Sequence, residues 1–339
     1  MSRKFEYKSA LAPYMNSFVA MKEARGFNNL REKWILNEID MFANDHGLTE
    51  PVITEELIEA WKATRLNDCP CTLYAKYSVW SQLAKYMNTN GCKCFVTRLP
   101  RHASSKSSFQ PYIFTDDEIS RILAECDRQR MYDAHMNLTM FAMPCLVRVL
   151  FSTGARIAEI LSIRNRDVHL DKGFILLRKT KNGKERVVPV CKSLKAVMEQ
   201  YEKYRAMLPV NGASHPEAYY FVKLDGTPLT AATVLARFKS IYKKCGIKYM
   251  GNHHGPRVHD ARHTWACHAL RQMVANGMDV YAGLPILSVC LGHASISATE
   301  KYVRLMITEF PEIEEQCSDA NRIIFQHLNP YCSCINIQS

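Results

Sequence analysis

A break in the hydrophobic pattern between Arg98 and Tyr112 places the strongest constraint on the fold of this chain. The break is rich in serine and basic residues, contains two prolines, and follows neither the helical nor the strand period. Such a composition is typical of a linker. A chain of 339 residues is long enough for two domains, with a sizeable core in at least one of them. We therefore predict an N-terminal domain at residues 1–97, a basic linker at 98–112 and a second domain from residue 113.

The N-terminal part predicts a small all-helical domain with four helices. Pro13 suits an early position of the first helix, Gly26 suits its end, and Thr54 is a suitable N-cap for the third. The fourth pattern spans about residues 72–91, where apolar side chains recur at i, i+3, i+7 and i+10. We expect this face to be buried; it consists of Tyr77, Trp80, Ala84 and Met87.

The C-terminal part combines helical patterns with two short β-rich runs. Thr115 precedes an acidic first turn and can cap a helix there. Residues 174–179 and 186–190 are β-rich, and the Asn182-Gly183 pair between them indicates a hairpin. Further elements are predicted as helices at 194–208 and 231–244 and a short strand at 219–222. The expected fold class is mainly α with a small β-sheet.

The stretch from Pro256 to Leu305 gathers residue types that can act on a phosphodiester. His259 and Arg262 lie at i, i+3 and can therefore share one face of a helix. A Leu-Gly-His sequence ends at His293, and Tyr302 follows nine residues later on the next helical pattern. Metal-free cleavage requires cationic donors around the phosphate oxygens, a nucleophile, and an acid for the leaving oxygen. We expect the tyrosine to be accessible enough to act as the nucleophile.

Two upstream residues supply what that stretch lacks. Arg156 opens a short helical segment, and its guanidinium fork matches the geometry of a phosphate. Lys181, at the tip of the predicted hairpin, could swing into a groove and protonate a leaving 5′ oxygen. Each residue also has a structural explanation, such as an ion pair between Arg156 and Glu159 at i, i+3. The single residues leave both explanations open.

Five motifs in this order resemble those of the tyrosine recombinase (phage integrase) family. They are Thr153–Ser162, the hairpin Thr180–Pro189, His259–Thr264, Leu291–His293 and Ala298–Tyr302. The resemblance covers about residues 114–305, and the four-helix front part more weakly resembles the family's core-binding domain. It implies a core-binding domain at residues 1–97 and a mixed α+β catalytic domain at 113–310. A C-terminal tail at 311–339 would be of the kind that docks on a neighbouring subunit.

The resemblance also implies a role for each matching residue. Tyr302 would attack the scissile phosphate, forming a 3′-phosphotyrosyl link and freeing a 5′ hydroxyl. Arg156 and Arg262 would hold the non-bridging oxygens, and His293 would hydrogen-bond the same phosphate. The remaining roles, proton transfer with the tyrosine and protonation of the leaving group, fall to His259 and Lys181.

By the same resemblance, the chain would be a two-domain, site-specific recombinase that integrates or excises a phage or another mobile element. The covalent link conserves bond energy, so strand exchange would need no ATP, metal or other cofactor. The implied partners are double-stranded DNA with core recombination sites, a homotetramer on two duplexes, and an accessory factor that bends DNA or sets direction. One departure from compact members is a longer interval at residues 273–290, where we expect an extra turn or loop.

Charge and hydropathy agree with a DNA partner and argue against export. Lys and Arg exceed Asp and Glu by 44 to 33, and the net charge of +11 favours a polyanionic partner. The first residues are charged and lack the apolar core of a signal peptide. The most apolar run, about residues 141–151, contains Arg148 and is too short for a membrane span. We expect a cytoplasmic, nucleoid-associated protein with no membrane partner.

Two other functions are compatible with parts of the sequence. His259 and His263 lie at i, i+4 beside Asp260, as in zinc-binding helices, but the HExxH glutamate is absent and Arg262 would place a cation beside the metal. The 13 cysteines include three Cys-x-Cys pairs rather than the Cys-x-x-Cys usual for zinc, so free thiols are expected. The second alternative is a recombinase-like DNA-binding protein without activity. The presence of every predicted catalytic residue argues against it.

Overall fold

The computed structural model describes residues 5–27, 30–100, 111–129, 138–178, 180, 183–251 and 255–309, with side chains through residue 306. The chain divides into two compact units, Met1–Ser108 and Phe109–Ser339. The division falls inside the segment predicted as a linker, of which residues 101–110 lie outside the described part. The predicted tail at 311–339 and the hairpin residue Lys181 also lie outside it.

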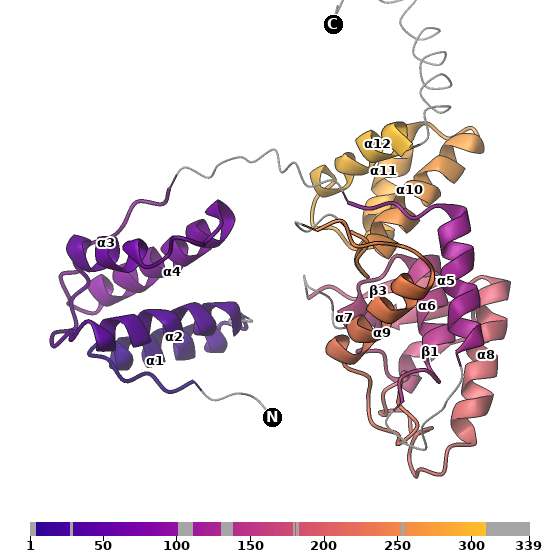
Figure 1. Ribbon diagram of the computed structural model, residues 1–339, viewed down its shortest axis with the longest axis horizontal. Coiled ribbons are helices and arrows are strands. Elements are labelled where there is room, and N and C mark those ends of the chain that lie inside the picture. Colours follow the sequence, from indigo (N-terminus) through magenta and orange to yellow (C-terminus); the bar gives the residue numbers. More distant parts are fainter. Residues whose placement is uncertain are drawn as a thin grey trace, which may run out of the picture. The chain divides into compact units, whose positions relative to one another are not determined.

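Within the described residues up to Pro100, the first unit contains four helices (Figure 1). They are α1 (Ala12–Ala24), α2 (Leu30–Asp45), α3 (Glu55–Ala63) and α4 (Pro70–Thr89). The Thr54 hydroxyl caps α3 by accepting the backbone N–H of Leu57 at 3.2 Å, as its position in the sequence predicted. The core is built around Trp61 and Trp80, whose rings meet edge to face with centroids 5.8 Å apart. The predicted face of α4 is buried.

In the second unit, helices surround a small antiparallel sheet. Its first part consists of α5 (Asp116–Arg128), α6 (Met143–Thr153), α7 (Ile157–Ile160), a 3-10 turn (Asn165–Asp167), β1 (Val168–His169), β2 (Phe174–Leu177), β3 (Arg186–Pro189), α8 (Lys192–Ala206) and α9 (Ala231–Lys244). The sheet order is β1-β2-β3, and β2 pairs with β3 from Phe174–Pro189 to Leu177–Arg186. The two runs that predicted a hairpin are therefore paired as expected. The class, mainly α with a small sheet, is confirmed.

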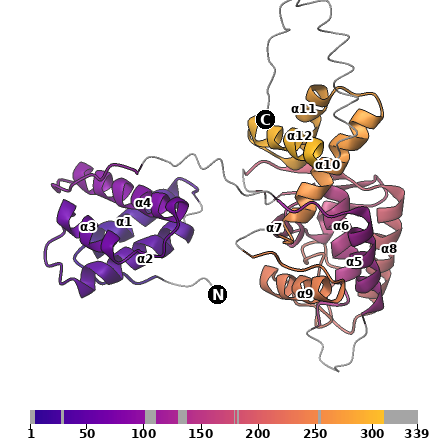
Figure 2. The ribbon, with the colours of Figure 1, turned by 45° about the horizontal axis from the view of Figure 1, so that its top comes forward.

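Three further helices complete the second unit and carry most of the residues of interest. They are α10 (Asp260–Ala275), α11 (Val280–Leu291) and α12 (Ser297–Glu309). Figures 1 and 2 show them gathered at one end of the unit, with α10 reaching back toward α6. Their shared apolar cluster includes Cys267, Leu270, Leu287 and the side chain of Tyr302. Packing of these helices thus decides where the predicted nucleophile lies.

One predicted element was wrong, and one element was not predicted. Residues 219–222 form isolated bridges (Arg164 with Tyr219, Val222 with Pro228) rather than a strand. Side chains of α8 satisfy part of this backbone, because the Tyr201 hydroxyl accepts from Val222 N at 3.1 Å and donates to Tyr220 O at 3.1 Å. The short strand β1 was not predicted. Its two residues carry too little pattern to be recognised.

The interval at 273–290, where an extra turn or loop was expected, contains the end of α10, a short turn and most of α11. Residues up to Ala275 continue α10, and Asp279 caps α11 by accepting the backbone N–H groups of Tyr281 and Ala282 at 2.9 and 3.0 Å. The connection is a short turn, and most of the interval is the apolar helix α11, which contains Pro285. Among the described helices, none is both long enough and apolar enough to cross a membrane.

Candidate active site

Tyr302 lies fully buried on α12, with none of its surface exposed. The expectation of an accessible tyrosine was therefore wrong: α12 packs this side chain between α10 and α11. Its hydroxyl is 3.0 Å from Nδ1 of His263 on α10. Burial raises the pKa of the phenol to about 12, although the nearby Arg262 acts in the opposite direction. At neutral pH the tyrosine is a neutral phenol.

Arg262 joins three separate segments of the chain. Its Nη1 donates to the carbonyl of Gly154 at 2.9 Å, and its Nη2 donates to the carbonyl of Leu291 at 2.6 Å. The side chain is 2% exposed, and burial, followed by the charge of Arg156, lowers its pKa to about 10. The guanidinium remains charged at neutral pH. Its remaining N–H groups can serve an anion.

The turn that receives Arg262 depends on a glycine. Gly154 ends α6 with φ at +60°, a left-handed conformation that favours glycine. A Cβ added there would lie 2.4 Å from the Trp265 ring on α10. The lack of a side chain therefore allows α10 to approach the end of α6. This close approach brings Arg156 and Arg262 to the same site.

Arg156 is held by a buried carboxylate. Its Nη1 and its backbone N donate to the two oxygens of Glu159, each at 2.8 Å. Arg186 on β3 donates to the same oxygens at 3.0 and 2.7 Å, and its Nε donates to the Cys290 carbonyl at 3.0 Å. Burial alone would raise the pKa of Glu159, but hydrogen bonds from Arg186 and Arg156 outweigh it and lower the pKa to about 2. The carboxylate stays ionised and fixes both arginines.

His293 follows Gly292, which ends α11 in the left-handed conformation at φ +64°. The Nδ1 of His293 lies 2.8 Å from the buried Thr299 hydroxyl on α12. Its ring is parallel to the Tyr302 ring, with centroids 6.2 Å apart. Burial, followed by the charge of Arg262, lowers the pKa of His293 to about 4. The neutral imidazole can therefore offer an N–H from Nε2 while Nδ1 accepts from the threonine.

His259 precedes α10 rather than lying within it. It occupies the N-cap, and Asp260 fixes the turn by accepting the backbone N–H of Arg257 at 2.8 Å. The His259 backbone is nonetheless helical, so its ring meets that of His263 edge to face with centroids 5.0 Å apart. Desolvation, followed by the charge of Arg262, lowers the pKa of His259 to about 4. It is a neutral group beside the pair formed by His263 and Tyr302.

Comparison with the sequence models of known families identifies the family of this chain. Residues 113–308, more than half of the chain, match the sequence model of the phage integrase family. The chain belongs to the phage integrase family. The matched segment contains every residue for which the motifs predicted a catalytic role.

Individual relatives and solved structures agree with this membership. The integrase-family chain is 28% identical over 313 residues to y4rB of Sinorhizobium fredii, covering 89% of this chain and 94% of the relative. It is 25% identical to tyrosine recombinase XerA of Pyrococcus furiosus, covering 63% of this chain and 64% of XerA. A crystallised lambda integrase dimer bound to a COC′ core site has the same fold, with a TM-score of 0.60 and 16% identity over 86% of this chain and 94% of that one.

The structure of this member of the phage integrase family brings five of the six predicted residues to one site. The five are Arg156, His259, Arg262, His293 and Tyr302. The charges of Arg156 and Arg262 act on the pKa values of His259, His293 and Tyr302. The sixth, Lys181, lies outside the described residues, between strands β2 and β3. Its role stays a prediction.

Sequence analysis missed three contributors to the site. His263 contacts the tyrosine hydroxyl, Arg186 shares the Glu159 carboxylate, and Thr299 contacts His293. The sequence signals for His263 are its place in the His259–Thr264 motif and its i, i+4 spacing from His259, a pattern that also occurs in metal-binding helices. No group of three His, Cys, Asp or Glu side chains able to hold a metal ion occurs among the described residues.

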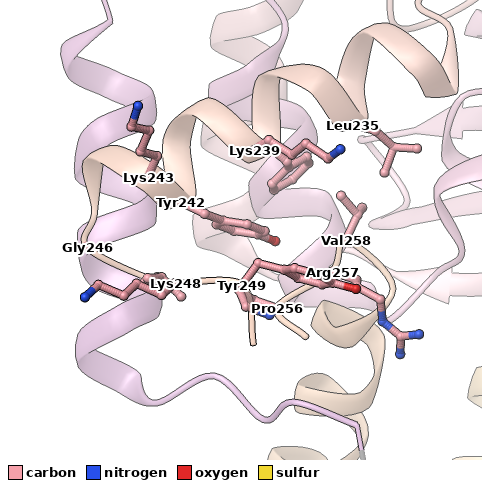
Figure 3. Close-up of a pocket in the computed structure, with 12 residues that line it drawn as sticks. Leu235, Lys239, Tyr242, Lys243, Gly246, Lys248, Tyr249, Pro256, Arg257 and Val258 are labelled. Atoms are coloured by element: carbon pink, nitrogen blue, oxygen red, sulfur yellow. The ribbon is translucent and has the colours of Figure 1, made fainter. Parts of the chain in front are cut away.

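A basic pocket lies next to the segment that enters α10. It has a volume of about 890 Å³ and is lined by Leu235, Phe238, Lys239, Tyr242, Lys243, Gly246, Ile247, Lys248, Tyr249, Pro256, Arg257 and Val258. Figure 3 shows the two tyrosines in its middle, with Lys243 and Lys248 at one end and Arg257 at the other. Three lysines and an arginine thus line a pocket whose wall includes Val258, the residue before His259.

Proposed function

We propose that this integrase-family chain is a site-specific DNA recombinase that cuts and rejoins DNA through a 3′-phosphotyrosyl intermediate. Its role would be integration or excision of a phage or another mobile element. The observation that carries the proposal is the surroundings of Tyr302: a phenol in contact with His263, with Arg262 and the ring of His293 beside it. Neutral imidazoles and fixed guanidinium groups around one hydroxyl suit attack on a phosphate.

In the proposed reaction, two arginines would bind the scissile phosphate. Arg262 uses two N–H groups on carbonyls and Arg156 uses one side-chain N–H group on Glu159, so each retains donors for non-bridging oxygens. His293 would add a third contact through Nε2. Because Glu159 is already neutralised by two arginines, it would not repel the phosphate strongly.

The proposed transfer is balanced without a cofactor. The Tyr302 oxygen forms a bond to phosphorus while the bond from phosphorus to the 5′ oxygen breaks. The phenolic proton is transferred to His259, and Lys181 donates a proton to the departing 5′ oxygen. The reverse sequence, starting from a 5′ hydroxyl of another strand, would regenerate the tyrosine and complete the exchange.

Double-stranded DNA is the partner that the charge distribution supports. The net charge is +11, and the basic pocket beside His259 presents four cations near the proposed site. Among proteins with the same fold, lambda integrase has been crystallised as a tetramer bound to a Holliday junction, at a TM-score of 0.59 and 17% identity over 86% of this chain and 76% of that one. By analogy we propose a homotetramer on two duplexes, with the 311–339 segment docking on a neighbouring subunit and an accessory factor setting direction.

Covalent trapping tests the proposal. The protein is incubated with a library of nicked duplexes. After cleavage, the short fragment that carries the freed 5′ hydroxyl diffuses away, and DNA-linked protein is isolated under denaturing conditions. We expect adducts from the unchanged chain and from Tyr281→Phe, in which an exposed tyrosine is altered. We expect none from Tyr302→Phe, although this variant should still bind DNA.

The same experiment separates the two rival functions. Adducts that persist when Tyr302 is replaced would show that another residue is the nucleophile. DNA binding without any adduct would favour a binding protein that lacks activity. Cleavage that is abolished by EDTA and leaves no covalent link would favour a metal-dependent hydrolase using the His259 and His263 pair.

A further inference from the structure

His263 stands in direct contact with the proposed nucleophile, although no catalytic role was assigned to it. It lies on α10 immediately after Arg262, and its Nδ1 is 3.0 Å from the Tyr302 hydroxyl. The imidazole is 4% exposed and the phenol is not exposed at all. Among the described residues, His263 is the one that forms a hydrogen bond of ordinary length with the Tyr302 hydroxyl.

The surroundings decide the direction of this hydrogen bond. Burial, followed by the charges of Lys301, His259, Arg262 and Arg257, lowers the pKa of His263 to about 2. The imidazole is therefore neutral, and it faces cationic or neutral groups from both α10 and α12. The positive charge of Arg262 acts on the phenol, so the phenolic oxygen directs its lone pairs toward the guanidinium. The phenolic O–H then donates to Nδ1, and the imidazole proton resides on Nε2.

We propose that His263 is a positioning residue for the nucleophile: its Nδ1 accepts the Tyr302 O–H and thereby directs the phenolic oxygen toward Arg262. This inference rests on the function proposed above. His263 is not the base that removes the proton, because its neutral form is far too strongly favoured by its surroundings. It fixes one rotamer of the hydroxyl and keeps the phenol protonated until a phosphate is bound.

Such a contact has a consequence for the rate of attack. Attack on phosphorus requires the phenolic oxygen to lie in line with the leaving oxygen, and a misplacement of about 1 Å can slow a reaction by about a hundredfold. Lys301 covers the Tyr302 ring, with its Nζ 5.1 Å from the ring centroid, and His293 lies parallel to it. These neighbours restrict the ring, but only His263 restricts the hydroxyl among the contacts described.

The purely structural alternative is that His263 only joins α10 to α12. Three substitutions separate the two roles. In His263→Asn, an amide group can occupy nearly the position of Nδ1, whereas His263→Gln places its amide nearer the position of Nε2. His263→Leu retains apolar volume and removes the acceptor.

The first measurement is the rate of adduct formation at saturating nicked DNA, together with the dissociation constant for the same DNA. We expect His263→Leu and His263→Gln to slow adduct formation by about 30-fold or more, with the dissociation constant changed less than about twofold. His263→Asn should recover to within about fivefold of the unchanged protein. Equal rates in all forms, or equal loss in the Asn and Leu variants in proportion to lowered thermal stability, would overturn the inference.

The second measurement requires no DNA. The ¹³Cζ resonance of Tyr302, identified by its loss in Tyr302→Phe, reports the hydrogen bond of the phenol. It should be similar in the unchanged protein and His263→Asn, and displaced in His263→Leu. If Tyr302→Phe still forms adducts, the proposed nucleophile fails whatever the His263 variants do. If adducts depend on Tyr302 but neither rate nor resonance responds to His263, only the present inference fails.

Discussion

The carboxylate of Glu159 accepts both terminal nitrogens of Arg186, at 3.0 and 2.7 Å, while it also accepts Arg156 at 2.8 Å. One buried anion thus fixes two arginines from different elements. Because Arg186 Nε donates to the Cys290 carbonyl at 3.0 Å, the same group anchors β3 to the end of α11, three residues before His293. The positions of Arg156 and His293 are therefore linked through a residue that contacts neither the proposed nucleophile nor the phosphate in our mechanism.

Replacement of Arg186, which shares the Glu159 carboxylate with Arg156, should destabilise the second unit. Arg186→Lys keeps the charge but loses the paired donors to Glu159, and we expect the free energy of unfolding in urea to fall by about 2 kcal/mol. The matched control is Arg166→Lys, whose partner Glu217 is exposed, so its cost should stay below about 1 kcal/mol. Equal costs for the two substitutions would show that the Glu159 pair contributes no more than a surface ion pair.

Acid should destabilise the protein before its carboxylates are protonated. The pKa of His263 falls from 6.5 to about 2 on folding, so the unfolded chain binds a proton that the folded chain does not. The associated stability is complete above pH 6.5 and is lost as the pH decreases below it. Between pH 7 and pH 5 this residue alone should cost about 2 kcal/mol. His263→Asn should reduce the difference in unfolding free energy between these two pH values. An unchanged difference would show that His263 is not the source of the acid destabilisation.

A side chain at Gly154 should disrupt the approach of α10. In Gly154→Ala, the new methyl group would lie 2.4 Å from the Trp265 ring in a backbone that already has positive φ. We expect a loss of about 3 kcal/mol in unfolding free energy. Gly212→Ala is the control, because Gly212 has a φ of +82° and no atom within 4 Å of the added Cβ. It should cost about 1 kcal/mol, and a similar loss at both glycines would exclude the Trp265 contact as the cause.

Thr299 should influence cleavage through His293. Thr299→Val removes the hydroxyl 2.8 Å from His293 Nδ1 and frees the imidazole to change its tautomer or rotate. We expect adduct formation to slow by roughly tenfold to a hundredfold while DNA binding is retained. Thr299→Ser preserves the hydroxyl and should stay close to the unchanged rate. A valine variant with normal kinetics would show that the His293 orientation is set by other contacts.

The basic pocket should contribute to the salt dependence of DNA binding. Substituting both Lys239 and Lys243 with glutamine should lower the slope of log binding constant against log salt by about 2, because each phosphate contact contributes about 0.9. Lys203→Gln on α8 is the control for a general loss of charge. Fluorescence anisotropy with a labelled duplex at several salt concentrations gives the slopes. An unchanged slope in the double variant would place the DNA elsewhere.

The sequence predicted the elements well where local signals were strong. Thr54 and Thr115 cap helices as expected, and the Asn182-Gly183 pair correctly indicated that β2 and β3 form a hairpin. Prediction failed at residues 219–222, where aromatic and β-branched residues resembled a strand. There side chains of α8 form hydrogen bonds with Tyr220 O and Val222 N, a tertiary contact that no local pattern contains.

The amino-acid sequence by itself determined the family and five of the polar residues around the site, because the order and spacing of the motifs are properties of the chain. Only the tertiary structure decided how these residues meet. Tyr302 is buried because α12 packs on α10 and α11, and this packing converts His263 from a neighbour in sequence of Arg262 into the partner of the phenol. Burial and hydrogen bonding depend on atoms brought together from segments more than a hundred residues apart, as in the contact from Arg262 to Gly154.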